Sequence, residues 1–220
     1  MKKRNLIITA IFLPIIILIT TCIMLDLSFI HSIDKFVFDL VHSARNVFLN
    51  YFFVIVTYLG ETITVVALCA IAVFIPKNQK ITIPVVLLMI LGALSNHLFK
   101  DFVERARPIG VFLENPPFNY PFPTSYSFPS GHSQNGFLFY FTIIYVFTTK
   151  YFKNNRKKIM IISTIIISLI PFSRIYLGVH FFTDVVVGTL LGILFSLWFI
   201  YFFNKYENKL CSNGVKNESN

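Results

Sequence analysis

The sequence has few charged residues: 13% of its 220 residues are Asp, Glu, Lys or Arg, whereas 55% are hydrophobic. A soluble domain of this length carries more charge and has shorter apolar runs. Several apolar runs here approach or exceed the roughly 18–20 residues that a helix needs to cross a bilayer. The composition therefore excludes a soluble globular domain and predicts an all-α integral membrane protein.

Cysteine is also scarce, and the spacing of the three cysteines matches neither a disulfide framework nor a metal site. Cys22 and Cys69 lie inside apolar runs, where cysteine behaves as a small hydrophobic residue. The sequence has no cluster of carboxylates suited to Mg²⁺. The net charge of +9 comes from short basic clusters between apolar runs, which is typical of topology signals. We infer no disulfide, no metal, no cofactor and no nucleic-acid partner.

The N-terminal segment begins with basic residues and continues as an apolar run, as a signal peptide does. The run is too long for an ordinary signal sequence, and no small-residue cleavage site follows it. Thr21 is branched at the position where a lipoprotein signal has a small residue. We therefore expect a retained first transmembrane helix.

We predict a single membrane domain over residues 1–220 with six transmembrane helices. The predicted helices cover about residues 5–25, 52–75, 81–100, 132–149, 158–173 and 181–203. Residues 30–45 carry apolar side chains at helical spacing, namely Ile33, Phe36, Val37, Leu40 and Val41. Asp34, Lys35, Asp39 and His42 fall largely on the other side. This pattern predicts an amphipathic helix in the membrane interface, and a polar connector with some helix explains it too.

The basic residues predict the orientation of these helices. With a cytoplasmic N-terminus, 13 of the 19 basic residues fall in cytoplasmic segments. They are Lys2, Lys3, Arg4, Lys77, Lys80, Lys150, Lys153, Arg156, Lys157, Lys158, Lys205, Lys209 and Lys216. Because cytoplasmic loops are enriched in Lys and Arg, both termini are expected in the cytoplasm, with segments 101–131 and 174–180 facing outward.

Three polar motifs lie in or beside these outward segments. They read Lys100-DFVERA-Arg107-Pro108, Pro129-Ser130-Gly131-His132, and Ser173-Arg174-IYLGV-His180-FFT-Asp184. Lys100, Arg107 and Arg174 supply three cations, and arginine forms bidentate contacts with phosphate oxygens. Ser130 is a plausible N-cap at the start of the fourth predicted helix, and Gly131 lets a ligand approach the backbone. A helix N-terminus favours anions, so this set of groups predicts a phosphate site.

The histidines of these motifs have the arrangement of a nucleophile and an acid. His180 and Asp184 are four residues apart and share a face of a helix. A carboxylate on one ring nitrogen fixes the tautomer and leaves the other nitrogen as a nucleophile. His132 is then the candidate general acid.

The three motifs together resemble the motif set of the type 2 phosphatidic acid phosphatase superfamily and match every defining position in order. The resemblance implies a metal-independent phosphatase in which His180 attacks phosphorus and forms a phosphohistidine, and Asp184 orients His180. It implies that His132 protonates the leaving oxygen and then activates water. The residues that it implies for holding the phosphate are Lys100, Arg107, Ser130, Gly131 and Arg174.

The resemblance implies a lipid phosphate as substrate, with undecaprenyl diphosphate, phosphatidylglycerol phosphate and phosphatidic acid all consistent with it. The outward site favours undecaprenyl diphosphate. The motifs do not separate this phosphatase from a lipid-linked phosphotransferase that uses the same phosphohistidine. A lipid transporter that only binds phosphate is a third reading, although binding alone needs no oriented nucleophile. Vanadium haloperoxidases share related motifs but have a soluble architecture.

A few polar residues remain outside the motifs. We expect His31, His42, His97 and Arg105 to be interfacial anchors. Glu61, in the second predicted helix, is assigned no role, being suited either to the outer interface or to a polar cavity. The proline-rich segment 116–123 is expected to be a stiff loop rather than a lid over the substrate.

Overall fold

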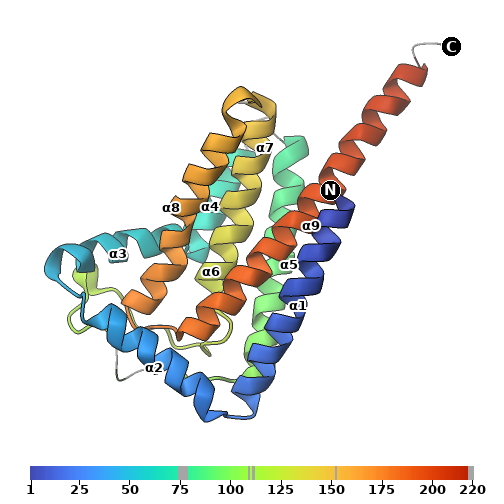
Figure 1. Ribbon diagram of the computed structural model, residues 1–220. Coiled ribbons are helices and arrows are strands. Elements are labelled where there is room, and N and C mark those ends of the chain that lie inside the picture. Colours follow the sequence, from blue (N-terminus) through green and yellow to red (C-terminus); the bar gives the residue numbers. More distant parts are fainter. Residues whose placement is uncertain (74–78, 109, 111, 152, 218–220) are drawn as a thin grey trace.

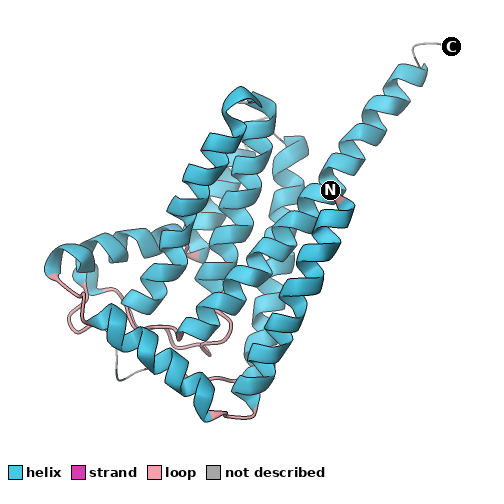
Figure 2. Ribbon diagram, viewed as in Figure 1, coloured by secondary structure: helices cyan, strands magenta, loops and turns pink. Residues whose placement is uncertain are grey.

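The computed structural model describes residues 1–73, 79–108, 110, 112–151 and 153–217, and within these ranges the chain is helical with no strand (Figure 2). The longer helices are α1 (Lys2–Met24), α2 (Ser28–His42), α3 (Val47–Leu59), α4 (Thr62–Val73), α5 (Gln79–Val103), α6 (Gly131–Gly136), α7 (Thr142–Tyr151), α8 (Arg156–Tyr176) and α9 (Phe182–Asn217). Figure 1 shows α1, α5 and α9 side by side, α8 separated from α1 and α5 by α6 and α7, and α2 running across one end of the bundle.

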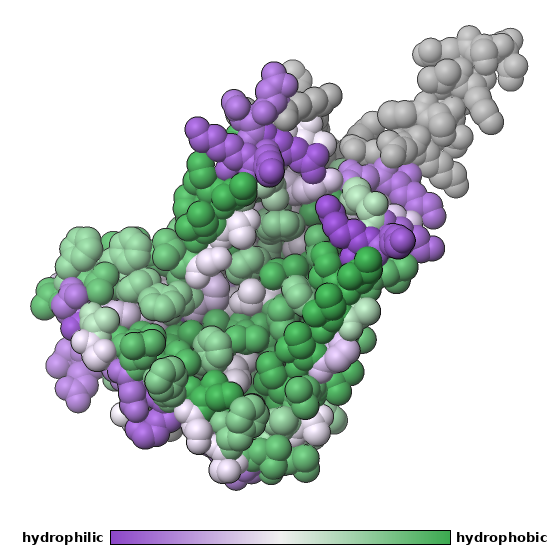
Figure 3. Space-filling model, in the orientation of Figure 1, coloured by the Kyte–Doolittle hydropathy of each residue, from purple (hydrophilic) through white to green (hydrophobic). Residues whose placement is uncertain are grey.

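Among the described residues, four helices are long and apolar enough to cross a membrane: Lys2–Met24, Ile83–Val103, Arg156–Tyr176 and Phe182–Tyr206. They correspond to the first, third, fifth and sixth predicted spans. Large apolar side chains cover the outer faces of α1, α5 and α8, where a soluble protein would have polar ones. Figure 3 shows this apolar surface below the polar groups that gather near the α7–α8 connection and near the N-terminus. The protein is therefore a multi-pass membrane protein.

The second predicted span is two helices rather than one. Segments Val47–Leu59 and Thr62–Ile71 meet at an angle of 51°, and together they are apolar enough for one broken span. Gly60 ends α3 at the bend, and a Cβ added there would collide with Ile170 of α8. Because α8 comes so close, only glycine fits at this position. Glycine weakens a helix, which agrees with the break in the span here. The remaining residues of the prediction, 74–75, lie outside the described ranges.

The fourth predicted span, 132–149, also departs from one regular α-helix. Helix α6 continues into a π-helical turn, Phe137–Phe141, before α7 begins. Its first turns bury polar side chains of Ser133, Gln134 and Asn135, which lower its hydropathy. The described residues thus contain four clear membrane-spanning helices and one bent pair, so the prediction of six is not confirmed.

Helix α2 confirms the predicted helix over the amphipathic segment, but its buried face differs from the prediction. The buried residues are Ile30, Asp34, Phe38 and Val41, so Asp34 lies on the inner face rather than with the polar residues outside. Phe36 is 68% exposed, as an apolar side chain in contact with lipid would be. The reason for the inward carboxylate is a buried arginine, described below.

Close backbone contact between α6 and α9 sets the geometry of the site. A Cβ at Gly188 would collide with the carbonyl oxygen of Ser130, and one at Gly192 with the carbonyl oxygen of Gln134. The absence of side chains at these two positions, one turn apart on α9, lets the N-terminal turn of α6 lie directly against α9. The backbone N–H of Ser130 also donates to the backbone oxygen of Asp184 at 3.0 Å. The second and third motifs are therefore held together through backbone atoms.

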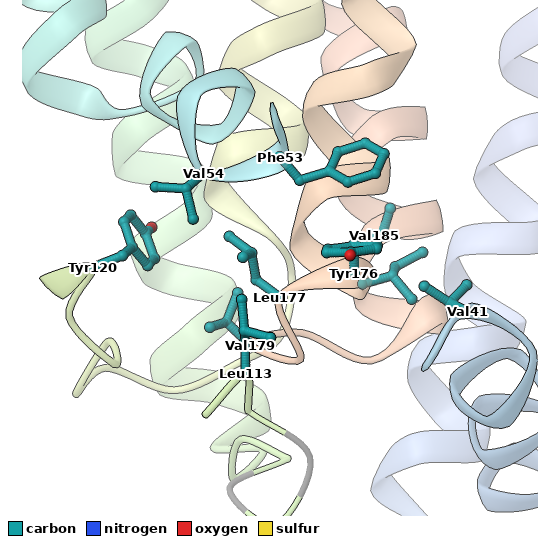
Figure 4. Packing of buried hydrophobic residues seen from close by; sticks show 10 residues of the cluster. Val41, Phe53, Val54, Leu113, Tyr120, Tyr176, Leu177, Val179 and Val185 are labelled. Carbon is teal, nitrogen blue, oxygen red and sulfur yellow. The ribbon is translucent and has the colours of Figure 1, made fainter. Parts of the chain in front are cut away.

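A buried cluster of apolar side chains joins the elements that surround the site (Figure 4). Its members come from α2, α3, the loop after α5, the end of α8 and the start of α9. They are Val41, Phe53, Val54, Leu113, Tyr120, Ile175, Tyr176, Leu177, Val179 and Val185. Since these elements come together at the motif end of the bundle, the cluster fixes the loop residues relative to the helix ends.

Candidate active site

The three motifs meet around one polar cavity of about 250 Å³. Its lining contains the cations of the motifs and both histidines, and no carboxylate. The lining residues are Thr62, Ala93, Asn96, His97, Lys100, Arg107, Pro123, Ser125, Gly131, His132, Asn135, Arg174 and His180. Three cations without a carboxylate in the wall make the cavity suited to an anion.

Lys100 and Arg107 are held by the backbone of the loop that follows α5. Lys100 donates to the carbonyl oxygen of Tyr126. Arg107 donates from Nε to the carbonyl oxygen of Ser125 at 2.6 Å and from Nη1 to that of Val179 at 2.7 Å. Burial and the neighbouring charge of Arg174 lower the pKa of Arg107 to about 10, so it remains a cation at neutral pH. Both cations are thus fixed before any ligand binds.

Arg174, at the end of α8, is 1% exposed and is the most deeply buried of the three cations. Its Nη1 donates to the hydroxyl oxygens of Thr57 at 2.5 Å and Tyr120 at 2.6 Å. Its Nε is buried with no hydrogen-bond partner among the described residues. A buried guanidinium with a donor to spare is costly unless an anion accepts from it, so this arginine also indicates an anion site.

His180 lies in the turn between α8 and α9, between Arg107 and Asp184. Its Nε2 is 3.1 Å from Nη1 of Arg107, and its Nδ1 is 3.5 Å from Oδ2 of Asp184. A guanidinium only donates, so Nε2 is the acceptor and the proton of the neutral ring is on Nδ1, facing the carboxylate. The lone pair of Nε2 therefore points to the cationic side of the cavity wall.

The surroundings keep His180 neutral. Burial lowers its pKa well below 6.5, and the positive charges of Arg107, Arg174 and Lys100 lower it further. The imidazole is 2% exposed, and Asp184 is fully buried behind it. At neutral pH the ring is therefore unprotonated, and one of its nitrogens carries a free lone pair.

The N-terminal turn of α6 confirms Ser130 as the N-cap. The Ser130 hydroxyl accepts from the Ser133 hydroxyl at 2.8 Å, and Gly131, the first residue of the helix, lines the cavity. His132 follows, and its Nε2 is buried without a hydrogen-bond partner among the described residues. The helix N-terminus contributes partial positive charge to the same wall as the three cations.

Arg105 is not the interfacial anchor that the sequence predicts. It is a buried bridge, with Nη1 2.6 Å from Oδ1 of Asp184 and Nη2 2.6 Å from Oδ2 of Asp34. Its position two residues before Arg107 does not distinguish Arg105 from an arginine at the membrane interface. Its partner Asp34 lies 71 residues away in sequence, so local spacing does not reveal the pair. The signal that could have found the pair is Asp34 itself, a carboxylate at helical spacing with Ile30 and Phe38.

Other residues outside the motifs also reach the site. His97 lines the cavity wall, and Tyr120, from the proline-rich segment, contacts Arg174. His31 instead pairs with Asp26 at 2.6 Å on the surface, and Glu61 lies at the bend between α3 and α4. Cys22 and Cys69 are free. Nowhere in the described ranges do three or more His, Cys, Asp or Glu side chains gather as they would around a metal ion.

A second, apolar cavity of about 410 Å³ adjoins the polar one. It lies between α4 and α5, and it shares Thr62, Ala93 and Asn135 with the polar cavity. Its other lining residues are Val65, Val66, Cys69, Ala70, Val86, Met89 and Ile90. The site thus combines a cationic chamber with an apolar space beside it.

The chain is similar in sequence to proteins of known name. The phosphatidylglycerophosphatase B of Bacillus subtilis is 38% identical over 112 residues, which cover 49% of this chain and 52% of that protein. The undecaprenyl-diphosphatase of Sulfolobus acidocaldarius is 27% identical over 156 residues, covering 70% of this chain and 71% of that protein. The chain thus spans about half the length of the first relative and a larger share of the second.

A solved structure matches over most of the fold. The crystal structure of a transmembrane PAP2 type phosphatidylglycerolphosphate phosphatase from Bacillus subtilis aligns with a TM-score of 0.78 and 28% identity, covering 89% of this chain and 96% of that chain. The sequence profile of the PAP2 superfamily matches residues 81–207, which hold all three motifs and more than half of the chain. The chain therefore belongs to the PAP2 superfamily.

Proposed function

We propose that the protein removes a phosphate group from a membrane lipid at the outer face of the membrane, through a phosphohistidine on His180. The observation that carries this proposal is the position of His180, whose Nε2 faces Arg107 and whose Nδ1 faces Asp184. A phosphate that enters the cavity takes over the hydrogen bond from Arg107, and the Nε2 lone pair is then free to attack phosphorus.

The reaction proceeds in two halves. In the first, Nε2 of His180 forms a bond to phosphorus while the bond from phosphorus to the lipid oxygen breaks, and His132 gives its proton to that oxygen. In the second, His132 takes a proton from water, the water oxygen attacks phosphorus, and inorganic phosphate leaves His180. Lys100, Arg107, Arg174 and the first turn of α6 stabilise the charge on the phosphate oxygens in both halves.

A lipid substrate is supported by the apolar cavity between α4 and α5, which opens beside the cationic one. A hydrocarbon chain in this space places its phosphate next to Asn135 and His132. The relatives are named as a phosphatidylglycerophosphatase and an undecaprenyl-diphosphatase, and both names refer to lipid phosphates. We favour undecaprenyl diphosphate, because an outward site meets the diphosphate released there.

The outward site follows from the proposed topology. We retain six crossings, with α3 and α4 as one bent crossing and α6 through α7 as another, and both termini in the cytoplasm. The basic cluster at the start of α8 then lies inside and the motifs lie outside.

The test is phosphate release by purified protein in detergent with EDTA present, from undecaprenyl diphosphate, phosphatidylglycerol phosphate and phosphatidic acid. We expect release from at least one of these lipids by the wild type and none above background by His180→Ala. A folded His180→Ala protein that releases phosphate at near the wild-type rate contradicts the mechanism. Release without any preference for undecaprenyl diphosphate contradicts the substrate while leaving the mechanism intact.

A further inference from the structure

The carboxylate that faces His180 is tied to the amphipathic helix α2 by a buried ionic bridge. Arg105 contacts Asp184 with one guanidinium nitrogen and Asp34 of α2 with another, both at 2.6 Å. The side chain of Arg105 is 8% exposed, and those of Asp34 and Asp184 are 2% and 0% exposed. The bridge therefore lies in the interior, where it is little screened by solvent.

Thr183 completes the bridge. Its backbone N–H donates to Oδ1 of Asp34 at 2.9 Å, and its hydroxyl donates to Oδ2 of the same carboxylate at 2.9 Å. The hydroxyl oxygen also accepts from Nη1 of Arg105 at 2.8 Å. The guanidinium lies 4.0 Å from the centre of the Phe181 ring. Because the two carboxylates contact different nitrogens of the Arg105 guanidinium and the Phe181 ring lies beside it, this planar group is held in one orientation.

The bridge determines which oxygen of Asp184 faces the histidine. Oδ1 is occupied by Arg105, and Oδ2 accepts from the backbone N–H of Phe181 at 2.9 Å. Only Oδ2 then faces Nδ1 of His180. Without Arg105, only the Phe181 N–H still limits rotation of the carboxylate, and the oxygen that faces Nδ1 of His180 is no longer held in one position.

The charges of the bridge also suit a histidine that becomes positive. Asp34 and Asp184 carry two negative charges against the one positive charge of Arg105, so the cluster has a net charge of −1 beside His180. A positive charge on the imidazole ring of His180 brings the sum over the ring and the bridge to zero. Arg105 is not among the residues that line the phosphate cavity, so it acts through Asp184 rather than on the phosphate.

We propose that Arg105 and Asp34 are positioning residues for Asp184, which makes helix α2 a part of the catalytic apparatus. This inference rests on the proposed function, because it needs His180 as the nucleophile. Stability alone does not require the bridge, since buried ion pairs are often replaced by apolar residues at no cost to folding.

The first experiment compares Asp34→Asn with Asp39→Asn on the same helix. Both changes remove one carboxylate charge and keep the side-chain shape, but Asp39 forms an exposed pair with Lys35 and faces away from the site. We expect Asp34→Asn to lower kcat about 10- to 100-fold with KM changed less than twofold, and Asp39→Asn to leave both at wild-type values. Equal kcat values for Asp34→Asn and Asp39→Asn overturn the proposal.

A second experiment separates positioning from folding. Arg105→Lys keeps the charge but puts one nitrogen in place of the two that now contact the two carboxylates, so the fixed two-nitrogen geometry is lost. Arg105→Met removes the charge. We expect kcat to fall in the order wild type, Lys, Met. In an Asp184→Asn background, Arg105→Met should lower kcat no further, because its effect runs through Asp184. An equal fold-loss in both backgrounds, with a parallel fall in thermal stability, assigns Arg105 a purely structural role and refutes the proposal.

The outcome for His180→Ala distinguishes this inference from the proposed function. If His180→Ala is inactive and Asp34→Asn is fully active, the phosphohistidine mechanism holds but α2 has no part in it. If His180→Ala is active, both the phosphohistidine mechanism and the proposed role of α2 are wrong.

Discussion

The hydroxyl of Tyr120 offers a direct test of how Arg174 is held for the phosphate. Tyr120 belongs to the proline-rich segment, is 3% exposed, and accepts from Nη1 of Arg174 at 2.6 Å. The same nitrogen also donates to Thr57. Tyr120→Phe removes one of these two acceptors and keeps the ring that packs in the buried cluster of Figure 4. The substitution therefore loosens the arginine without emptying the core.

The expected size of the effect follows from the hydrogen bond that is lost. A hydrogen bond to a charged group contributes about 1.5–3 kcal/mol, and the donor here keeps a second acceptor, so about 1–1.5 kcal/mol is lost. Because 1.36 kcal/mol corresponds to a factor of ten in rate, kcat/KM should fall about five- to tenfold. The inhibition constant of vanadate, which resembles five-coordinate phosphorus, should rise by a similar factor.

The assay is phosphate release in detergent, with Tyr126→Phe as the matched control. Tyr126 lies in the same loop, and its hydroxyl has no hydrogen-bond partner among the described residues, while its backbone oxygen still accepts from Lys100. We expect wild-type kinetics from Tyr126→Phe. If Tyr120→Phe also stays within twofold of wild type in kcat/KM and in vanadate inhibition, the segment does not position Arg174, and the reasoning fails.

Three further predictions concern sidedness, metal and pH. Single cysteines are placed at the exposed positions Asn119 and Asn154 in a background without the native cysteines. An impermeant thiol reagent added to intact cells should label position 119 and not position 154, and the reverse pattern refutes the topology. Turnover should survive EDTA, because the proposed steps use only protein groups; loss with EDTA and recovery with Mg²⁺ contradicts the mechanism. The pKa of His180 is below 6.5 in the folded state and near 6.5 in the unfolded state, so below pH 6.5 the unfolded state binds the proton more readily. The stability of the fold should therefore be highest above pH 6.5 and should fall as the pH drops, by up to about 1.4 kcal/mol per pH unit from this residue. Thermal unfolding of His180→Gln should show a weaker acid dependence than the wild type, and identical curves contradict a buried neutral His180.

The sequence predicts the helices and the motif residues because both depend on short-range patterns. Long apolar runs identify α1, α5, α8 and α9 without reference to their neighbours. Lys100 and Arg107 come from one short stretch, as do His180 and Asp184, so spacing alone brings each pair close. The site residues thus follow from local sequence once three such stretches are placed on one side of the membrane.

The features that the sequence does not predict depend on contacts between distant segments. The bend at Gly60 follows from the approach of Ile170, which lies 110 residues further along the chain. The inward face of α2 is selected by Arg105, because a buried guanidinium needs carboxylates on both sides. Helical periodicity alone counts Asp34 as polar and places it outward. Only the packing of α2 against the loop after α5 decides between the two faces.

The charges on the two sides of His180 couple its chemistry to the bound phosphate. Burial is the main cause of the lowered pKa of His180, and on the cavity side Arg107, Arg174 and Lys100 lower it further and oppose any positive charge on the ring. On the other side, Asp184 and Asp34 favour that charge, but Arg105 offsets one of the two carboxylates. The ring therefore stays neutral while the cavity holds no anion. In the proposed mechanism, a phosphate that neutralises the three cations removes their opposition, so that His180 can accept the positive charge that bond formation to phosphorus creates. The same cations then have two roles in that mechanism: they bind the substrate, and they help to keep His180 unprotonated until the substrate arrives.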